Sequence, residues 1–251
     1  MTIYDSKDIG YLLAGPWNLA GISSKLEVGT ANPVTETTGF GATAATFAQP
    51  GVKRHEITGH ESWYDDALYT TASEMVALTA GEHVLMLAHE GNAQAKKAYC
   101  AGGILYGGFQ TIMTVADLHR AALELAVSGV LDEATIVAAL TSRAGDLTTE
   151  ATYVDLGTTG GGTTGGNAYL ACTALALTGS TNLIVTLEDS ANHVAWADHT
   201  VFTALTAVGA EKKVATDMTV NQYLAYKQAF TGLAGTPTCT ATLAFKVNDP
   251  H

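Results

Sequence analysis

Charged residues are scarce in this chain of 251 residues, where they make up 14% of the sequence against about 25% in a typical soluble domain. The apolar fraction of 47% is ordinary, and alanine, glycine and threonine take the place of the missing charge. A monomer usually covers its surface with charged side chains. The composition therefore leaves two interpretations open: a soluble β-protein with a threonine-rich surface, or a chain that covers part of its surface with copies of itself.

Basic residues are few as well, since 12 Lys and Arg stand against 24 Asp and Glu, which gives a formal charge of −12 and a pI of about 4.9. Tight nucleic-acid binding depends on Lys and Arg that neutralise phosphates, so this function is not expected. No apolar run reaches the ~18 residues that a membrane-spanning helix requires. The first residues have no basic stretch before an apolar core, so no signal peptide is expected.

Cysteine is also rare, and the number is odd: Cys100, Cys172 and Cys239 are the three in the sequence. Each lies in or beside an apolar run that resembles a strand. This usage predicts buried free thiols in a reducing cytosol and no disulfide framework.

What the sequence does contain is a series of short apolar runs in its last third, each followed by a turn signal. The runs cover residues 168–177, 182–188, 199–205, 222–230 and 238–247. In the last run the odd-numbered residues from Cys239 to Val247 are apolar, and most of the even-numbered ones are threonine. This pattern predicts antiparallel β-structure, with one buried face on the last strand.

The beginning of the chain is broken by Gly10, Gly15 and Pro16, so no regular element is predicted over residues 1–20. This segment is either an arm that lies across a neighbouring copy or a terminus folded onto its own domain. Residues 30–51 are rich in Thr, Gly and Pro and predict a long loop. Loops of this length are uncommon in compact domains unless they have a function.

Strands are predicted at residues 22–29, 52–62, 83–91 and 95–114, and an amphipathic helix at 66–79. Residues 115–140 are ambiguous. Their Ala and Leu content favours a helix, but their apolar residues also fit a period of two that is interrupted at Ser128-Gly129, and the resemblance described below favours two strands.

A Gly/Thr-rich stretch at residues 157–166 predicts a flexible linker. It would separate a β-domain at residues 1–156 from a C-terminal β-sandwich domain at residues 167–251. A long turn inside one domain is the alternative.

Motifs for catalysis or metal binding are not found. His55 and His60 bracket a sequence like H-E-x-x-H, but they are one residue too far apart and lie on a predicted strand. Asp65-Asp66 is typical of a helix N-terminus. The segment Asp189-Ser190-Ala191-Asn192 could offer oxygens to calcium, although its spacing favours a simple turn. The sequence therefore predicts a protein that is not an enzyme, with no catalytic residues, metal ligands or cofactor.

Residues 167–232 carry short motifs that follow one another in a fixed order between the apolar runs. The motifs are Glu188-Asp189-Ser190-Ala191, Trp196-Ala197-Asp198, Val201-Phe202-Thr203, Gly209-Ala210 and Asn221-Gln222-Tyr223-Leu224. In this order they resemble the C-terminal part of the major tail proteins, or tail tube proteins, of long-tailed bacteriophages. The first half fits more loosely, and the resemblance covers roughly residues 20–247.

The resemblance implies a mainly β fold: a tail-tube-type β-sandwich or barrel with one amphipathic helix, plus a C-terminal antiparallel β-sandwich region. It also implies a structural virion protein that self-assembles into stacked rings, commonly hexameric in this family, with an acidic lumen through which DNA passes without specific binding. The implied partners are copies of the chain itself and the tape measure, tail terminator and tail tip proteins. The implied location is the virion tail, assembled in the host cytoplasm without a membrane. The candidate inter-ring contacts, on the arm (1–20) and the loop (30–51), are Tyr11, Trp17, Phe40 and Phe47.

Two other functions are weighed against this one. A carbohydrate-binding or adhesive β-sandwich module is favoured by Trp63, Trp196 and the ten tyrosines, because sugar sites use exposed aromatic rings. A small hydrolase would need a pair of facing carboxylates that the sequence does not reveal.

Overall fold

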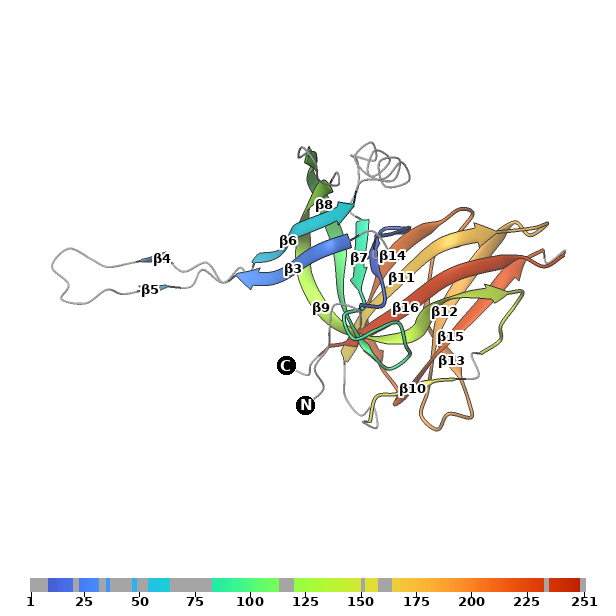
Figure 1. Ribbon diagram of the computed structural model, residues 1–251. Helices are drawn as coiled ribbons and strands as arrows, with labels where there is room; N and C mark the ends of the chain where they lie inside the picture. The colour runs from blue at the N-terminus through green and yellow to red at the C-terminus, as the bar shows by residue number, and fades with distance from the viewer. Residues whose placement is uncertain are drawn as a thin grey trace. The chain divides into compact units, whose positions relative to one another are not determined.

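The computed structural model describes residues 9–19, 23–31, 35–36, 47–48, 54–63, 83–112, 120–149, 152–157, 164–232 and 235–248. These residues form sixteen strands and no helix (Figure 1), which confirms the mainly β class. The predicted helix at 66–79 lies outside them. None of the described residues belongs to a helix long and apolar enough to cross a membrane.

The chain divides into two compact units. The first contains residues 1–21, 83–102 and 131–251, and the second contains residues 22–82 and 103–130. Strands β8 (Lys97–Ile112) and β9 (Arg120–Ala144) belong partly to each. This division differs from the predicted boundary at 157–166, where β11 (Thr164–Ala176) already begins. Residues 158–163 of the predicted linker lie outside the described part.

In the first unit two antiparallel sheets pack around a common core (Figure 1). The larger sheet has the order β14-β11-β16-β9-β8-β7-β1-β2, and the smaller one has the order β10-β15-β12-β13. Leu170 and Leu243 from the larger sheet meet Leu187 and Tyr226 from the smaller one, all completely buried. The bounds of the remaining strands are β1 Leu12–Ala14, β2 Trp17–Asn18, β7 His83–Leu87, β10 Val154–Asp155, β12 Asn182–Ser190, β13 Ala197–Val201, β14 Gly209–Thr219, β15 Tyr223–Thr231 and β16 Thr238–Val247.

Strand β16 is buried on both faces along its middle, whereas the alternation predicted one buried face. Its odd-numbered residues join the core between the sheets, as expected. On the other face, Thr242 and Ala244 are also completely buried. Ala244 belongs to a second core cluster, which contains Tyr11 and Met86 from the other end of the same sheet. The larger sheet therefore curls, and small residues on β16 leave room for this second core.

The N-terminal segment is part of the first unit, so of the two interpretations of residues 1–20 the folded terminus is the one observed for residues 9–19. Strand β1 pairs with β7, with Leu13 opposite Met86, and turns at Gly15 (φ +61°) into β2. Tyr11 has no exposed surface, and its side chain lies in the core of its own chain. Its contact with a neighbouring ring stays a prediction.

The second unit contains a four-stranded antiparallel sheet in the order β3-β6-β9-β8, with β3 at Ser23–Ala31 and β6 at Arg54–Trp63. Both predicted strands, 22–29 and 52–62, are thus confirmed. Beyond them, Thr35–Glu36 (β4) pairs with Phe47–Ala48 (β5). The ends of the predicted loop at 30–51 therefore continue the β3–β6 hairpin.

The ambiguous segment 115–140 is a strand from Arg120 onward. β9 is one strand of 25 residues and not two. Gly129, where the interruption was predicted, takes a left-handed conformation (φ +85°), but the strand continues through it. Residues 115–119 lie outside the described part. Strand β14, with Glu211, Lys212 and Lys213 in a row, is an element that the sequence analysis did not predict.

Candidate functional site

The other predicted inter-ring contact residues, Trp17, Phe40 and Phe47, lie in parts of the chain that the structure describes to different extents. Trp17 lies on β2, partly exposed, with its ring edge-on to His83 at 5.9 Å between centroids. Phe47 lies on β5, where only the backbone is described, and Phe40 lies outside the described residues. Of the four predicted contact residues, the structure therefore describes the side chains of Tyr11 and Trp17 alone.

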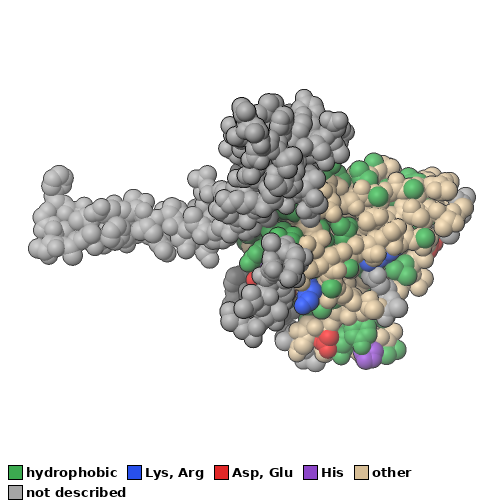
Figure 2. Space-filling model, in the orientation of Figure 1, with side chains coloured by type: hydrophobic (Ala, Val, Ile, Leu, Met, Phe, Trp, Pro, Cys, Tyr) green, Lys and Arg blue, Asp and Glu red, His purple; other side chains and the backbone are tan. Residues whose placement is uncertain are grey.

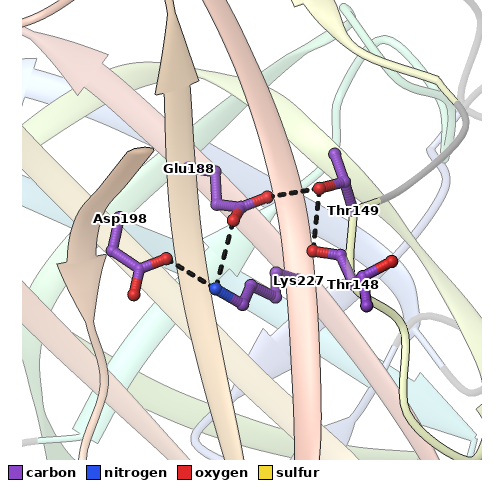
Figure 3. Close-up of polar contacts among 5 residues, drawn as sticks. All are labelled: Thr148, Thr149, Glu188, Asp198 and Lys227. Carbon is purple, nitrogen blue, oxygen red and sulfur yellow. Dashed lines mark hydrogen bonds and ion pairs between the residues drawn. The ribbon is translucent and has the colours of Figure 1, made fainter. Parts of the chain in front are cut away.

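A polar network lies on the outer face of the smaller sheet, which is the face turned away from the core between the sheets (Figure 3). Lys227 on β15 forms ion pairs with Asp198 on β13 at 2.7 Å and with Glu188 on β12 at 3.2 Å. The hydroxyl of Thr149 lies 2.7 Å from the other oxygen of Glu188 and can donate to it. The network therefore joins three neighbouring strands to the segment that precedes β10.

Glu188 is the buried member of this network, with 4% of its surface exposed. A carboxylate in such a position needs charged or hydrogen-bonding partners, because its desolvation is unfavourable. Lys227 supplies the opposite charge, and the pKa of Lys227 is raised chiefly by its hydrogen bond to Asp198 and further by Glu188. All three charged side chains are thus satisfied by one another, which makes this network a structural clamp.

Four aromatic rings gather on the same outer face. They come from Tyr153, which precedes β10, from His193 and Trp196 in the β12–β13 turn, and from Tyr223 at the start of β15. Tyr153 stacks on His193 with 5.3 Å between centroids and 15° between planes. Its ring also meets Tyr223 edge-on at 5.2 Å and Trp196 at 6.1 Å. We call these four residues the aromatic cluster.

The aromatic cluster is at the surface, although its rings touch. Tyr153 is 42% exposed, His193 is exposed, and Trp196 and Tyr223 are partly exposed. None of the four belongs to either core cluster. Figure 2 shows a surface with few charged side chains, on which hydrophobic side chains gather beside a histidine at the lower edge of the view. Such rings are available to a partner.

The turn that carries two of the rings is held by hydrogen bonds from its backbone N–H groups to the side chain of Asn192. Asn192 Oδ1 accepts hydrogen bonds from the N–H groups of Val194 and Ala195, both at 3.0 Å. Asp189, which was a candidate calcium ligand, points inward and accepts the N–H of Asn221 at 2.9 Å. This geometry is that of a turn, in agreement with the favoured interpretation of residues 189–192. No group of three acidic, His or Cys side chains suited to a metal occurs in the described ranges.

A carboxylate lies beside the rings. Asp155 on β10 is opposite Tyr223 on β15 in the sheet, and it is exposed. Its Oδ1 accepts hydrogen bonds from Gln222 Nε2 at 2.9 Å and from the N–H of Gly157 at 2.7 Å. These two bonds, together with the nearby His193, hold the pKa of Asp155 below its usual value. Asp155 is therefore a fixed, charged hydrogen-bond acceptor at the rim of the aromatic cluster.

The three cysteines are buried and free, as predicted. Burial is the main cause that raises the pKa of each thiol, to about 12 for Cys172. These thiols are therefore protonated at neutral pH and poor nucleophiles.

The sheet of the second unit is described by its backbone pairing. Val28 is opposite Ile57, and Ile57 is opposite Leu125 on its other side. Glu56 is opposite Gly29 on one side and Ala126 on the other. No described strand pairs with the side of β3 away from β6, whereas β8 pairs with β7 of the first unit as well as with β9. Among the described strands, β3 is thus an open edge of this sheet.

No family model matches the sequence, and no curated protein matches it.

Proposed function

We propose that this chain is the major subunit of the tail tube of a long-tailed bacteriophage, a structural protein that assembles with its own copies into stacked rings. The observation that carries the proposal is the open edge that strand β3 presents among the described strands of the second unit. The low charge and the series of tail-protein-like motifs support it.

A sheet with an open edge strand can be extended by a copy of itself. Unpaired strand edges expose N–H and C=O groups that readily pair with another chain, and a closed barrel removes such edges. In a ring, β3 of one subunit would pair with the second-unit part of β8 in the next, and the sheets would join into one barrel. Interfaces of this kind bury on the order of 2,000 Å² or more per pair, which accounts for a surface poor in charge.

The sequence of these strands fits this arrangement. Strands β3, β6 and β9 carry Glu27, Glu56 and Glu124, which would give the channel an acidic wall. A wall with carboxylates repels phosphates and lacks the Lys and Arg that bind them. DNA would therefore pass through without being held.

Stacking of the rings is assigned to the hairpin that β4 and β5 continue beyond β3 and β6. Phe40 and Phe47 in this hairpin would be the inter-ring contacts. The tape measure, tail terminator and tail tip proteins are the partners that such a tube requires, and the virion tail is its location.

The edge pairing is tested with proline variants of β3. In an antiparallel pair the N–H groups of successive residues point alternately to the partner strand and away from it. Of Gly29 and Thr30, which are opposite Glu56 and His55, one therefore donates towards β6 and the other points outward. Gly29→Pro and Thr30→Pro are made singly, and assembly is followed by sedimentation velocity over a concentration series.

The variant that loses the outward N–H should fold, as judged by circular dichroism, and remain monomeric where the unchanged protein sediments as rings or larger species. The other variant should lose stability and serves as the control. Assembly of the folded variant at the concentration required by the unchanged protein would contradict pairing through β3.

A further inference from the structure

We propose that the aromatic cluster is a binding site for a neutral saccharide chain, displayed on the outer face of the smaller sheet. This is a second function, separate from assembly, because the residues of the cluster belong to the first unit and the proposed ring edges to the second.

The rings provide a surface suited to sugars. The C–H bonds on one face of a pyranose carry a small positive charge and pack against the electron-rich face of an aromatic ring. Tyr153 keeps 42% of its surface exposed although three other rings contact it. Trp196, tilted by 48° to Tyr153, gives the surface a second plane. Two planes at such an angle can contact successive units of a chain.

The surface is fixed before any ligand arrives. His193 has a left-handed backbone (φ +51°), which is unfavourable for a residue with a side chain. In this conformation its ring stacks on Tyr153 and meets Tyr223 edge-on at 5.1 Å. The hydrogen bonds of Asn192 hold the turn in place. Rings that are already ordered lose little conformational freedom on binding.

Polar groups stand at the edge of the rings, where sugar hydroxyls would lie. The hydroxyls of Tyr153 and Tyr223 and the indole N–H of Trp196 make no hydrogen bond to any other residue that the structure describes. Asp155 has lone pairs beyond the two hydrogen bonds that it accepts. The site therefore combines stacking surfaces with directional donors and acceptors, which is the combination that a polyhydroxylated ligand requires.

The negative charge near the aromatic cluster distinguishes between the classes of ligand that stack on aromatic rings. Single-stranded nucleic acids also stack in this way, but their binding uses basic grooves along the backbone. Here the neighbouring charge is the carboxylate of Asp155, and the chain carries −12 overall. Nucleic acids, uronic acids and sialic acids are therefore disfavoured, and a neutral hexose or N-acetylhexosamine chain remains.

The test is isothermal titration of the full chain with soluble tetrasaccharides of glucose, N-acetylglucosamine, galactose and mannose, and with a tetrasaccharide of galacturonic acid. At least one neutral chain should bind at about 1 mM or tighter, and the acidic chain should not bind. Tyr153→Ala and Trp196→Ala should each weaken binding about tenfold or more. Tyr153→Phe, which keeps the ring, should retain most of the affinity.

Tyr99→Ala is the matched control, because Tyr99 stacks on His89 at 4.3 Å in the same unit but outside the cluster. It should bind as the unchanged protein does. The proposal is overturned if no neutral tetrasaccharide binds, if binding survives Tyr153→Ala and Trp196→Ala, or if the rings are found to capture a protein partner instead. Sedimentation of Tyr153→Ala should still show assembly, so that loss of sugar binding is distinguished from failure of the tail tube proposal.

Discussion

The buried hydrogen bond between Tyr11 and Thr242 gives the sharpest test that the N-terminal segment belongs to its own chain. The Tyr11 and Thr242 hydroxyl oxygens are 3.0 Å apart, and Thr242 donates to the carbonyl of Ala138 at 2.8 Å. Thr242 has a single hydroxyl proton, so Tyr11 must be the donor in their shared bond. Both residues have no exposed surface, and burial raises the pKa of Tyr11 well above its usual value.

Because Tyr11 is the donor, removing the donor and removing the acceptor should lower the free energy of unfolding by different amounts. Tyr11→Phe removes a donor and leaves Thr242 still bonded to Ala138, so it should lower the free energy of unfolding by about 1 kcal/mol. Thr242→Val leaves the Tyr11 hydroxyl buried without an acceptor, which should cost about 2 kcal/mol, up to about 3. In the double variant no donor is left unsatisfied, so its loss should not exceed that of Thr242→Val alone.

The assay is urea denaturation followed by circular dichroism, at a concentration where the protein is monomeric. Thr240→Val is the control, because Thr240 lies on the same strand, partly exposed, and its hydroxyl has no hydrogen-bond partner among the described residues. If all variants stay within about 0.5 kcal/mol of the unchanged protein, Tyr11 does not lie in this core. An arm that contacts a neighbour would give that result in the monomer.

Three further predictions concern the first unit. Gly166→Ala should lower the free energy of unfolding by about 2–3 kcal/mol in denaturant titration, because a Cβ there would overlap the Phe245 ring and the carbonyl oxygen of Lys246. Gly102→Ala is the control and should be close to neutral, because the nearest atoms belong to the flexible side chain of Lys212; equal effects of the two variants would contradict the packing described around Gly166. Lys227→Met should lower the free energy of unfolding by about 1–2 kcal/mol, since Glu188 keeps only neutral partners. The loss is below that of a fully buried ion pair because the Lys227 side chain is 31% exposed. Adding Glu188→Gln should restore part of the lost stability, and no restoration would contradict the ion pair between Lys227 and Glu188. The pKa of His199 is lowered by burial, only partly offset by Asp189, so the unfolded state takes up this proton first, and stability should fall as the pH drops below about 6.5 towards the lower folded pKa. Unfolding of His199→Gln measured at about pH 7.5 and about pH 5.5 should show a smaller difference than in the unchanged protein.

Much of the strand content could be predicted because apolar alternation and turn residues are local signals. The runs at 182–188 and 238–247 coincide closely with β12 and β16. β14 was missed because Glu211, Lys212 and Lys213 stand in a row near its start, so its sequence shows no apolar alternation there. The second buried face of β16 was missed because threonine and alanine are equally compatible with a surface, and only the curl of the sheet covers them.

From the sequence, the number of tyrosines and Trp196 could indicate only that aromatic residues are available, and not that four of them form the aromatic cluster. Its assembly depends on pairing between distant strands: Asp155 on β10 is opposite Tyr223 on β15, and Ser190 at the end of β12 is opposite Tyr223 on the other side. No local pattern specifies such pairs.

The central claim is that copies of this chain form rings around a channel. Negative-stain electron microscopy of the purified protein over a concentration series tests it most directly. The account predicts rings with a central hole, and stacks of them as the concentration rises. Particles that remain single subunits at every concentration, with β3 and β8 unpaired between copies, would contradict it.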